Sequence, residues 1–442
     1  MRKLFFILFM VVILLFSSCR AVPHSYGEIT AGDTWSSLFD AYWKKMNTNY
    51  IFWDVYDSEY GSWDGIYDYF MPRFEGLGKI GENEEEALRL FFDASKELDD
   101  GHYALTVFAK DGFLYMSSAT YKVMKDLGYS DDEIFRYSIY DTTLDYRKFE
   151  ECDFNAENIK NTFSAFGIEL PEDAAVPLTT VSGRGPFAAF TYFRTYDPET
   201  MKGMTTGYGI TDDGILYLGF SGFDFYSYFE TRNEFTEDVT SFLSGLSKAI
   251  DDNPEGIIID MRGNGGGYIV DLDILLPDFL EKGVAAEFAI SRRKLGDNRL
   301  DYGPWLPLCV YSNERSSFDK SIPIAVLTNK GSVSAAEMTT FFFKALHDEY
   351  GYDVTVVGGT TLGGHGSLVS NENELNGGSF NLSSHMVSSY TPSTEIRYID
   401  GISREGNGIE PDVSVPFDYD EYINRKNDIR FNMALKIIRE KL

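Results

Sequence analysis

The sequence predicts an α/β fold with a layered, largely parallel sheet, preceded by a helical region and a mixed α+β region. Short continuous apolar runs such as "GIIIDMRG" (256–263) recur in the second half of the chain and are typical of strands covered on both faces. Segments with helical spacing of apolar residues alternate with these runs, as in layered α/β domains. At 442 residues the chain is longer than a single core, so two or three domains are expected.

The expected elements follow in chain order. Residues 34–100 carry apolar residues at helical spacing, as in "WSSLFDAYWKKM", and predict a small helical domain. Residues 101–207 mix strand-like, helix-like and loop segments. Residues 208–442 form the predicted layered core, with strands at 214–223, 256–263, 322–329 and 353–359 and helices at 237–250 and 335–346.

The N-terminus predicts an export signal. Arg2 and Lys3 precede an apolar run that is too short to span a bilayer comfortably, which is typical of a signal peptide over residues 1–18. "FSSC" resembles a bacterial lipoprotein processing site, so we expect Cys19 to carry lipid and residues 19–33 to form a tether, with plain cleavage as the alternative. The expected location is the periplasm or the cell surface, with attachment to the membrane through Cys19 only.

Charge and composition exclude several classes of partner. A net charge of −30 disfavours nucleic acids and anionic lipid surfaces, which require Lys and Arg. Once Cys19 is set aside, only Cys152 and Cys309 remain, too few for a disulfide framework. No metal-ligand spacing is present. The "GNGGGY" stretch has Tyr268 where a dinucleotide fingerprint needs glycine, so no cofactor is expected.

Two segments have both a structural and a chemical interpretation. The glycines of "DMRGNGGGY" (260–268) could form a tight turn after a strand or present backbone N–H groups to a developing negative charge. Ser334 in "SVSAAE" could be a helix N-cap with Glu337 as its capping-box partner. Taken alone, the cap is the more common case. The same geometry would also suit a nucleophile, because the adjacent Ala335 N–H would then face the tetrahedral intermediate.

A serine nucleophile needs a base, and the chain has five histidines. His102 in "DDGHYAL" and His365 in "LGGHGSL" both lie where a loop meets a strand, so either could reach the end of a neighbouring strand. Taken singly, each is more often structural.

Together these residues resemble a family of serine peptidases, the one that includes tail-specific and C-terminal processing proteases and the tricorn core protease. The resemblance rests on pieces that occur in family order over residues 100–415: "DGH", "GILYLGFSGF", "IIIDMRGNGGG", "LTNKGSVSAAE", "VTVVGGTTLGG" and "GNGIEPDVSV". It implies a layered protease core of the crotonase and ClpP type over residues 208–442. Residues 103–207 lack the patterns of a standard PDZ module.

The resemblance also implies roles for individual residues. Ser334 corresponds to the nucleophile, and the Ala335 N–H with that of Gly266, or alternatively Gly265, to the oxyanion hole. No lysine occurs between Lys344 and Lys426, which disfavours the serine–lysine branch. In the tricorn-like branch His102 corresponds to the base and Glu405 to its orienting carboxylate, with His365 as the second candidate base. The expected substrate contacts are Gly219, Phe220, Ser221, Gly222, Gly363 and Gly364.

The predicted function is therefore an exported serine endopeptidase that acts on peptides or proteins through an acyl-enzyme. Peptide is expected to lie along a sheet edge near "FSGF" by strand addition. One alternative is a catalytically inactive lipoprotein that binds peptides or other ligands on the same scaffold. A crotonase-like acyl-CoA enzyme is the other, and export together with the acidic charge disfavours it. The sequence does not predict the oligomeric state or the cleavage specificity.

Overall fold

A computed structural model describes residues 29–140, 153–154, 158–171, 174–197, 203–295, 298–368, 377–383 and 386–442. The predicted signal peptide, Cys19 and most of the tether lie outside these residues.

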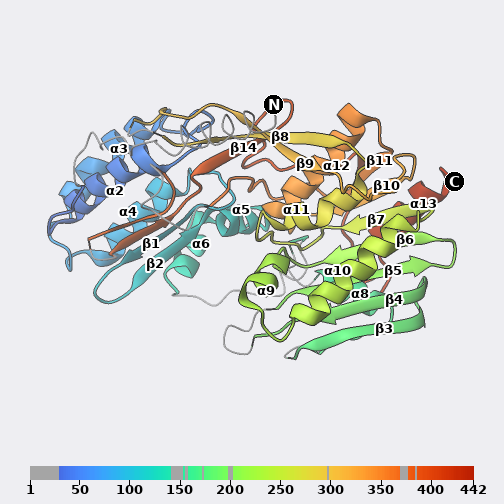
Figure 1. The fold of residues 1–442 in the computed structure, drawn as a ribbon. Helices are drawn as coiled ribbons and strands as arrows, with labels where there is room; N and C mark the ends of the chain where they lie inside the picture. Colours follow the sequence, from blue (N-terminus) through green and yellow to red (C-terminus); the bar gives the residue numbers. More distant parts are fainter. Residues whose placement is uncertain are drawn as a thin grey trace, which may run out of the picture.

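The largest element is an eight-stranded sheet in the order β15-β11-β10-β7-β6-β5-β4-β3 (Figure 1). Strands β6, β7, β10, β11 and β15 run parallel to one another, whereas β3, β4, β5 and β6 pair antiparallel. The bounds are β3 Val176–Arg184, β4 Phe187–Arg194, β5 Thr205–Thr211, β6 Ile215–Phe220, β7 Gly256–Asp260, β10 Ile324–Thr328, β11 Val354–Gly358 and β15 Val413–Ser414. The predicted α/β class with a largely parallel sheet is confirmed.

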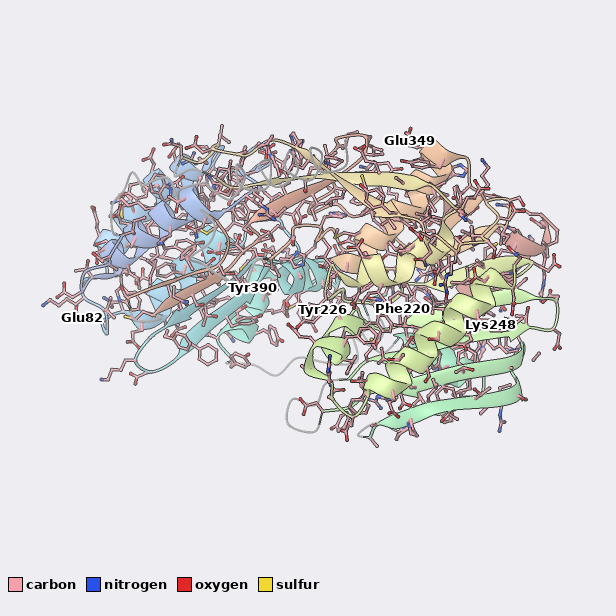
Figure 2. The ribbon with its side chains drawn as sticks, viewed as in Figure 1. Glu82, Phe220, Tyr226, Lys248, Glu349 and Tyr390 are labelled. Carbon is pink, nitrogen blue, oxygen red and sulfur yellow. The ribbon has the colours of Figure 1, made fainter. Side chains whose placement is uncertain are left out.

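Helices cover both faces of this sheet, and its central strands β6, β7 and β10 are buried at every position. Alternate residues of a strand point to opposite faces, so Ile257 and Ile259 pack in one core with helices α10 and α12, and Ile258 packs in a second core with α8 and α13. Phe220, labelled in Figure 2, lies in the first of these cores. The bounds are α8 Asn158–Ala165, α9 Phe225–Thr231, α10 Thr236–Asp251, α11 Asp271–Leu275, α12 Ala335–Tyr350 and α13 Ile429–Arg439.

The N-terminal helices pack around a second sheet, in the order β12-β13-β1-β2. Strands β1 and β13 pair antiparallel, so a hairpin from late in the chain completes the N-terminal unit. The helices are α2 Trp35–Asn49, α3 Trp63–Glu75, α4 Glu84–Ser95, α5 Ser118–Asp126 and α6 Asp131–Ser138, and the strands are β1 Ala104–Phe108, β2 Phe113–Ser117, β12 Phe380–Leu382 and β13 Val387–Tyr390.

The predicted domain boundaries need correction. We expected residues 101–207 to form one region, but β1 and β2 share a core with α2, whereas β3 and β4 extend the large sheet. The physical reason is that β1 pairs with residues 280 to 286 positions later, as in Val107 with Val387 and Ala104 with Tyr390, which no local pattern reveals. A third sheet, β14-β8-β9, lies between the two units in Figure 1, with β8 Ala285–Arg293, β9 Leu306–Tyr311 and β14 Thr394–Tyr398.

No helix within the described residues has both the length and the apolar character needed to cross a bilayer.

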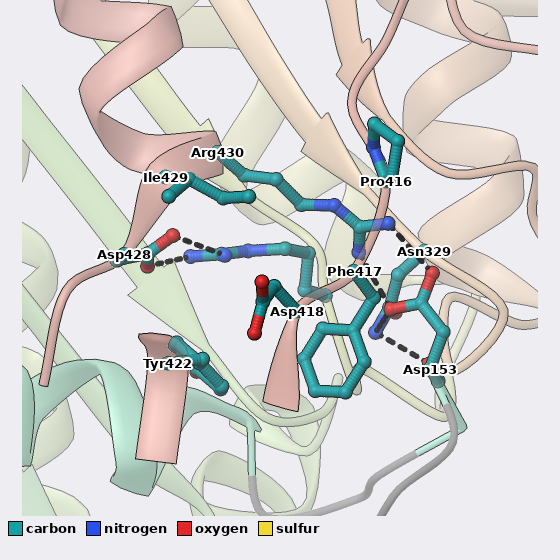
Figure 3. A pocket seen from close by; sticks show the side chains of 10 residues that line it. Asp153, Asn329, Pro416, Phe417, Asp418, Tyr422, Asp428, Ile429 and Arg430 are labelled. Carbon is teal, nitrogen blue, oxygen red and sulfur yellow. Dashed lines mark hydrogen bonds and ion pairs between the residues drawn. The ribbon is translucent and has the colours of Figure 1, made fainter. Parts of the chain in front are cut away.

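A buried ion network fixes the C-terminal helix against the end of β7 (Figure 3). Arg262 donates to both carboxylate oxygens of Asp260 and of Asp428, and all three side chains are less than 5% exposed. Arg430 forms a second, bidentate pair with Asp153 beside it. Because Arg262 lies directly before the glycines of residues 263–267, this network also fixes their position.

Replacing Arg262 by methionine should therefore destabilise the protein by about 3–5 kcal/mol, since two buried carboxylates would lose their shared cation. Urea unfolding followed by circular dichroism measures the change. Lys248→Met is the control, because the pair of Lys248 with Asp252 is exposed and should contribute little. Equal stability of the two variants would contradict a stabilising role for the network.

Candidate active site

The candidate site lies at the carboxyl ends of the parallel strands, where open α/β sheets bind their ligands. Three loops leave this edge side by side: the glycine turn (residues 263–268) after β7, the serine loop (329–334) after β10, and the His365 loop (359–366) after β11. The His102 segment (99–103), which precedes β1, packs against the His365 loop: a Cβ added to Gly101 would lie 2.5 Å from the Gly364 Cα.

The glycine turn and the serine loop are joined at close range. Val333 donates its N–H to the Asn264 carbonyl at 3.0 Å. A Cβ added to Gly266, which has a φ of +91°, would lie 2.6 Å from the Ser334 Cβ and 3.0 Å from the Ala335 nitrogen. Glycine is therefore required at position 266 for both its backbone conformation and the space beside the serine.

Ser334 precedes α12 in a backbone conformation that is rare for a residue with a side chain. Its φ and ψ are +58° and −119°. Such strain costs about 1–3 kcal/mol and is concentrated at functional sites. The Ser334 N–H donates to the Gly364 carbonyl at 3.0 Å and to Glu337 Oε2 at 3.3 Å. The predicted contact with Glu337 is thus present, and it coexists with the strained geometry that a simple helix cap does not need.

Glu337 is fully buried and joins α12 to the His365 loop. Its carboxylate accepts the N–H of Gly363 at 2.9 Å and of Gly364 at 2.7 Å, together with the hydroxyl of Thr361. Sequence reasoning assigned Glu337 only to the helix cap. The signal that could have revealed more is a single charged residue in a helical stretch that is otherwise uncharged, "AAEMTTFFF", because a buried carboxylate requires several donors.

Glu405 joins the His102 segment to the His365 loop. It accepts the Gly101 N–H at 3.1 Å, the His365 N–H at 2.8 Å and the Gly366 N–H at 3.0 Å. The Nδ1 atom of His102 is buried without a hydrogen-bond partner, so Glu405 orients the backbone before His102 rather than its ring. The structure therefore brings both residues to one place without forming the hydrogen bond expected between them.

Burial and charge set the protonation of these groups. Burial lowers the pKa of His102, and the nearby Glu405 and Glu337 only partly oppose it, so the ring favours the neutral form that a base requires. Burial would raise the pKa of Glu405, but the neighbouring His365 and His102 outweigh it and keep the pKa of this carboxyl low. Glu405 is therefore an anion.

Asp100 was not predicted to contribute. It accepts the backbone N–H of His102 at 2.9 Å and of Tyr103 at 2.6 Å, which fixes the turn that carries His102. Burial, with the charge of Glu405, raises the pKa of Asp100 well above its usual range. A signal was present in "DDGH", because Asp commonly accepts from backbone N–H groups two residues on in tight turns.

The groups expected to form the oxyanion hole differ in their availability. The Ala335 N–H begins α12, so it has no acceptor within the helix, and it lies beside Gly266. The Gly266 N–H instead donates to Asn264 Oδ1 at 2.9 Å, so it is occupied in this conformation. Gly265, the alternative donor, is exposed. Gly266 thus supplies space next to Ser334, and the Ala335 N–H is the better-placed donor.

Most of the expected substrate contacts are unavailable to a peptide in this conformation. Gly219 and Phe220 are buried in β6, which has β5 on one side and β7 on the other, so strand addition cannot occur there. The N–H and C=O groups of Gly363 and Gly364 bond within the protein. Only Ser221 and Gly222 stay partly exposed, beside the glycine turn. A continuous apolar strand does not by itself indicate whether it lies at the edge or in the interior of a sheet.

Four segments of the chain converge at this site. They carry the strained Ser334, the Ala335 N–H at the start of α12, the neutral ring of His102 and the buried carboxylate of Glu405. Such groups together can support nucleophilic attack and stabilisation of an oxyanion. Among the described residues, no group of three or more His, Cys, Asp or Glu side chains is arranged to hold a metal ion.

Comparison with known proteins shows which proteins this region is similar to. Residues 214–415 match the sequence profile of the family described as Peptidase family S41. The "Probable CtpA-like serine protease" of Staphylococcus aureus is 28% identical over 188 residues, which are 42% of this chain and 32% of that protein. The "Carboxy-terminal processing protease CtpB" of Bacillus subtilis is 32% identical over 127 residues, 29% of this chain and 22% of that protein. The match thus spans about a third or less of these relatives.

Solved structures share the fold over a longer stretch. One such protein is from Parabacteroides merdae, and its sequence is 20% identical to this chain. The superposition covers 92% of this chain and 97% of the other, with a TM-score of 0.58. The crystal structure of mature CPAF is 12% identical, covers 92% of this chain and 96% of its own, and gives a TM-score of 0.55. The N-terminal unit is therefore part of the shared fold.

Proposed function

Because residues 214–415 match the sequence profile of peptidase family S41, we propose that the protein is a serine endopeptidase that hydrolyses peptide bonds through an acyl-enzyme. The observation that carries the proposal is the close approach of the glycine turn to Ser334 at the N-terminus of α12. It leaves a strained serine next to a helix N–H that has no intrahelical acceptor.

In the proposed reaction His102 accepts the hydroxyl proton as Ser334 Oγ attacks the peptide carbonyl carbon. The Ala335 N–H stabilises the oxyanion of the tetrahedral intermediate. His102 then gives the proton to the leaving amine, and the acyl-enzyme remains. Water, deprotonated by His102, attacks the ester carbonyl carbon. As the bond to Ser334 Oγ breaks, His102 returns that proton to the serine and the second product leaves as the acid. Glu405 stabilises the imidazolium that forms in each step.

A fluorophosphonate probe tests the nucleophile directly. The wild type should become labelled, and mass spectrometry of its peptides should place the adduct on Ser334, because only an activated serine reacts rapidly. His102→Gln should react far more slowly, whereas His347→Gln, at an exposed position near the end of α12, should react normally. Peptide binding without labelling or hydrolysis would instead support an inactive binding protein on this scaffold.

We also propose that the protein is exported and lipidated at Cys19. Expressed with its own leader in a Gram-negative host, it should incorporate tritiated palmitate, and Cys19→Ser should not. The control is Cys309→Ser, which changes a half-buried thiol in β9 and should still be labelled. An unlabelled wild type whose mature N-terminus is not residue 19 would show plain cleavage.

A further inference from the structure

The proposed relay leaves the His365 side chain without a role, although it occupies the centre of the site. Its Nε2 lies 3.4 Å from Glu337 Oε1, and its Nδ1 lies 3.5 Å from Glu405 Oε2. All three side chains are 1% exposed or less. One face of the ring stacks on Phe341, with centroids 4.8 Å apart and an angle of 13° between the planes. The ring is therefore enclosed on its edges and on one face.

This enclosure does not suit a general base. Each ring nitrogen of His365 faces a carboxylate, and no part of the side chain reaches the surface of the site. Two carboxylates buried this close together need a cation, because an uncompensated buried charge is strongly unfavourable. An imidazolium between them supplies that cation.

The two carboxylates hold different parts of the site. Glu337 accepts the N–H of Ser334 and belongs to the helix that Ser334 begins. Glu405 accepts the N–H of Gly101, one residue before His102. Any shift of one carboxylate relative to the other would therefore change the separation of these two segments.

We propose that His365 is a positioning residue: its imidazolium, held between Glu337 and Glu405, fixes the serine loop against the His102 segment. The proposal rests on the serine peptidase function proposed above. His365 contacts neither substrate nor the reacting atoms, and it acts through the two carboxylates.

The charges around His365 make its positioning role sensitive to pH. Burial lowers the pKa of His365, but Glu337 and Glu405 outweigh burial and raise it above the ordinary value, against the weaker opposing charge of Arg404. His102 is the other titratable group facing it, and its own pKa is lowered, first by burial. The active form therefore has a neutral His102 and a charged His365. Activity should rise with pH through the pKa of His102 and fall through that of His365.

The raised pKa of His365 also affects the stability of the folded protein. The folded protein binds the His365 proton more tightly than the unfolded chain does, so this contribution is fully present below the unfolded pKa of about 6.5. It is lost as the pH rises through the raised pKa of the folded state.

The experiment compares wild type, His365→Gln and the control His347→Gln over pH 5 to 10. Hydrolysis of a fluorogenic peptide gives kcat/KM, and thermal unfolding gives the melting temperature. His365→Gln should lower kcat/KM at neutral pH about 10- to 100-fold, the effect of a small misplacement of reacting groups, and should lack the alkaline limb. It should remain far more active than Ser334→Ala. His347→Gln should keep the profile of the wild type.

Nuclear magnetic resonance of wild-type protein carrying ¹³Cε1-labelled histidine provides a second measurement that does not depend on folding of a variant. One buried histidine should titrate above 6.5 and one below it. The proposal is overturned if His365 titrates at or below that value, or if His365→Gln keeps the alkaline limb. Inactivity equal to that of Ser334→Ala would also overturn it, because His365 would then be the base. An inactive wild type whose His365 still titrates high would instead refute the peptidase function alone.

Discussion

Ser334→Ala should abolish peptide hydrolysis while leaving the fold intact. Loss of a serine nucleophile typically lowers kcat by roughly 10⁴- to 10⁶-fold, and the remaining rate comes from binding and oxyanion stabilisation. The fold should persist because alanine keeps the N–H that donates to Gly364 and Glu337. Kinetics with a fluorogenic peptide, together with urea unfolding, separate the two effects.

A matched control is Ser244→Ala, which removes a hydroxyl from the exposed face of α10. It should have the activity of the wild type. If Ser334→Ala kept more than a few per cent of the activity, Ser334 would not be the nucleophile, and its geometry would be that of a helix cap alone.

Gly266→Ala should lower kcat/KM by about 100- to 1,000-fold, comparable to the loss of an oxyanion-hole donor. The new Cβ would lie 2.6 Å from the Ser334 Cβ and 2.8 Å from the Val333 carbonyl oxygen, and the φ of +91° is itself unfavourable for alanine. The serine loop must move to accommodate it, which displaces both the Ser334 hydroxyl and the Ala335 N–H.

Gly265→Ala is the matched control, because a Cβ at that position meets no atom within 4 Å. Its activity should stay within a few-fold of the wild type. A result in the opposite order, with Gly265→Ala impaired and Gly266→Ala active, would show that the turn contacts substrate through Gly265 and that the space next to Ser334 is not limiting.

Motifs that lie directly after buried strands were predictable because their position follows from the fold class. The ends of β7, β10 and β11 are fixed by apolar runs, and parallel neighbours present their carboxyl ends at one edge. The glycine turn, Ser334 and the His365 loop therefore meet there, as the sequence suggested. The choice of His102 over His365 as the base, and the inclusion of Glu405, came from family resemblance, since neither His102 nor Glu405 follows a strand of this sheet.

The expected substrate contacts show what the apolar pattern of a strand does not reveal, which is the position of that strand in the sheet. "GILYLGFSGF" identifies a buried strand, and β6 is one, but strand order decides whether a strand is an edge. β6 pairs with β5 as well as with β7, so it lies in the interior of the sheet. The sequence of β5 gives no signal that this strand pairs with β6.

The sequence by itself determined the α/β class, the strands β6, β7, β10 and β11, and the position of Ser334 at the start of a helix, because these depend on local periodicity and capping. Only the tertiary structure decided how the carboxylates are used. Glu337 and Glu405 each bind backbone N–H groups from loops distant in the chain, and His365 lies between them. The physical reason is that a buried charge is tolerated only where donors from several segments converge, and that convergence is a property of the folded chain.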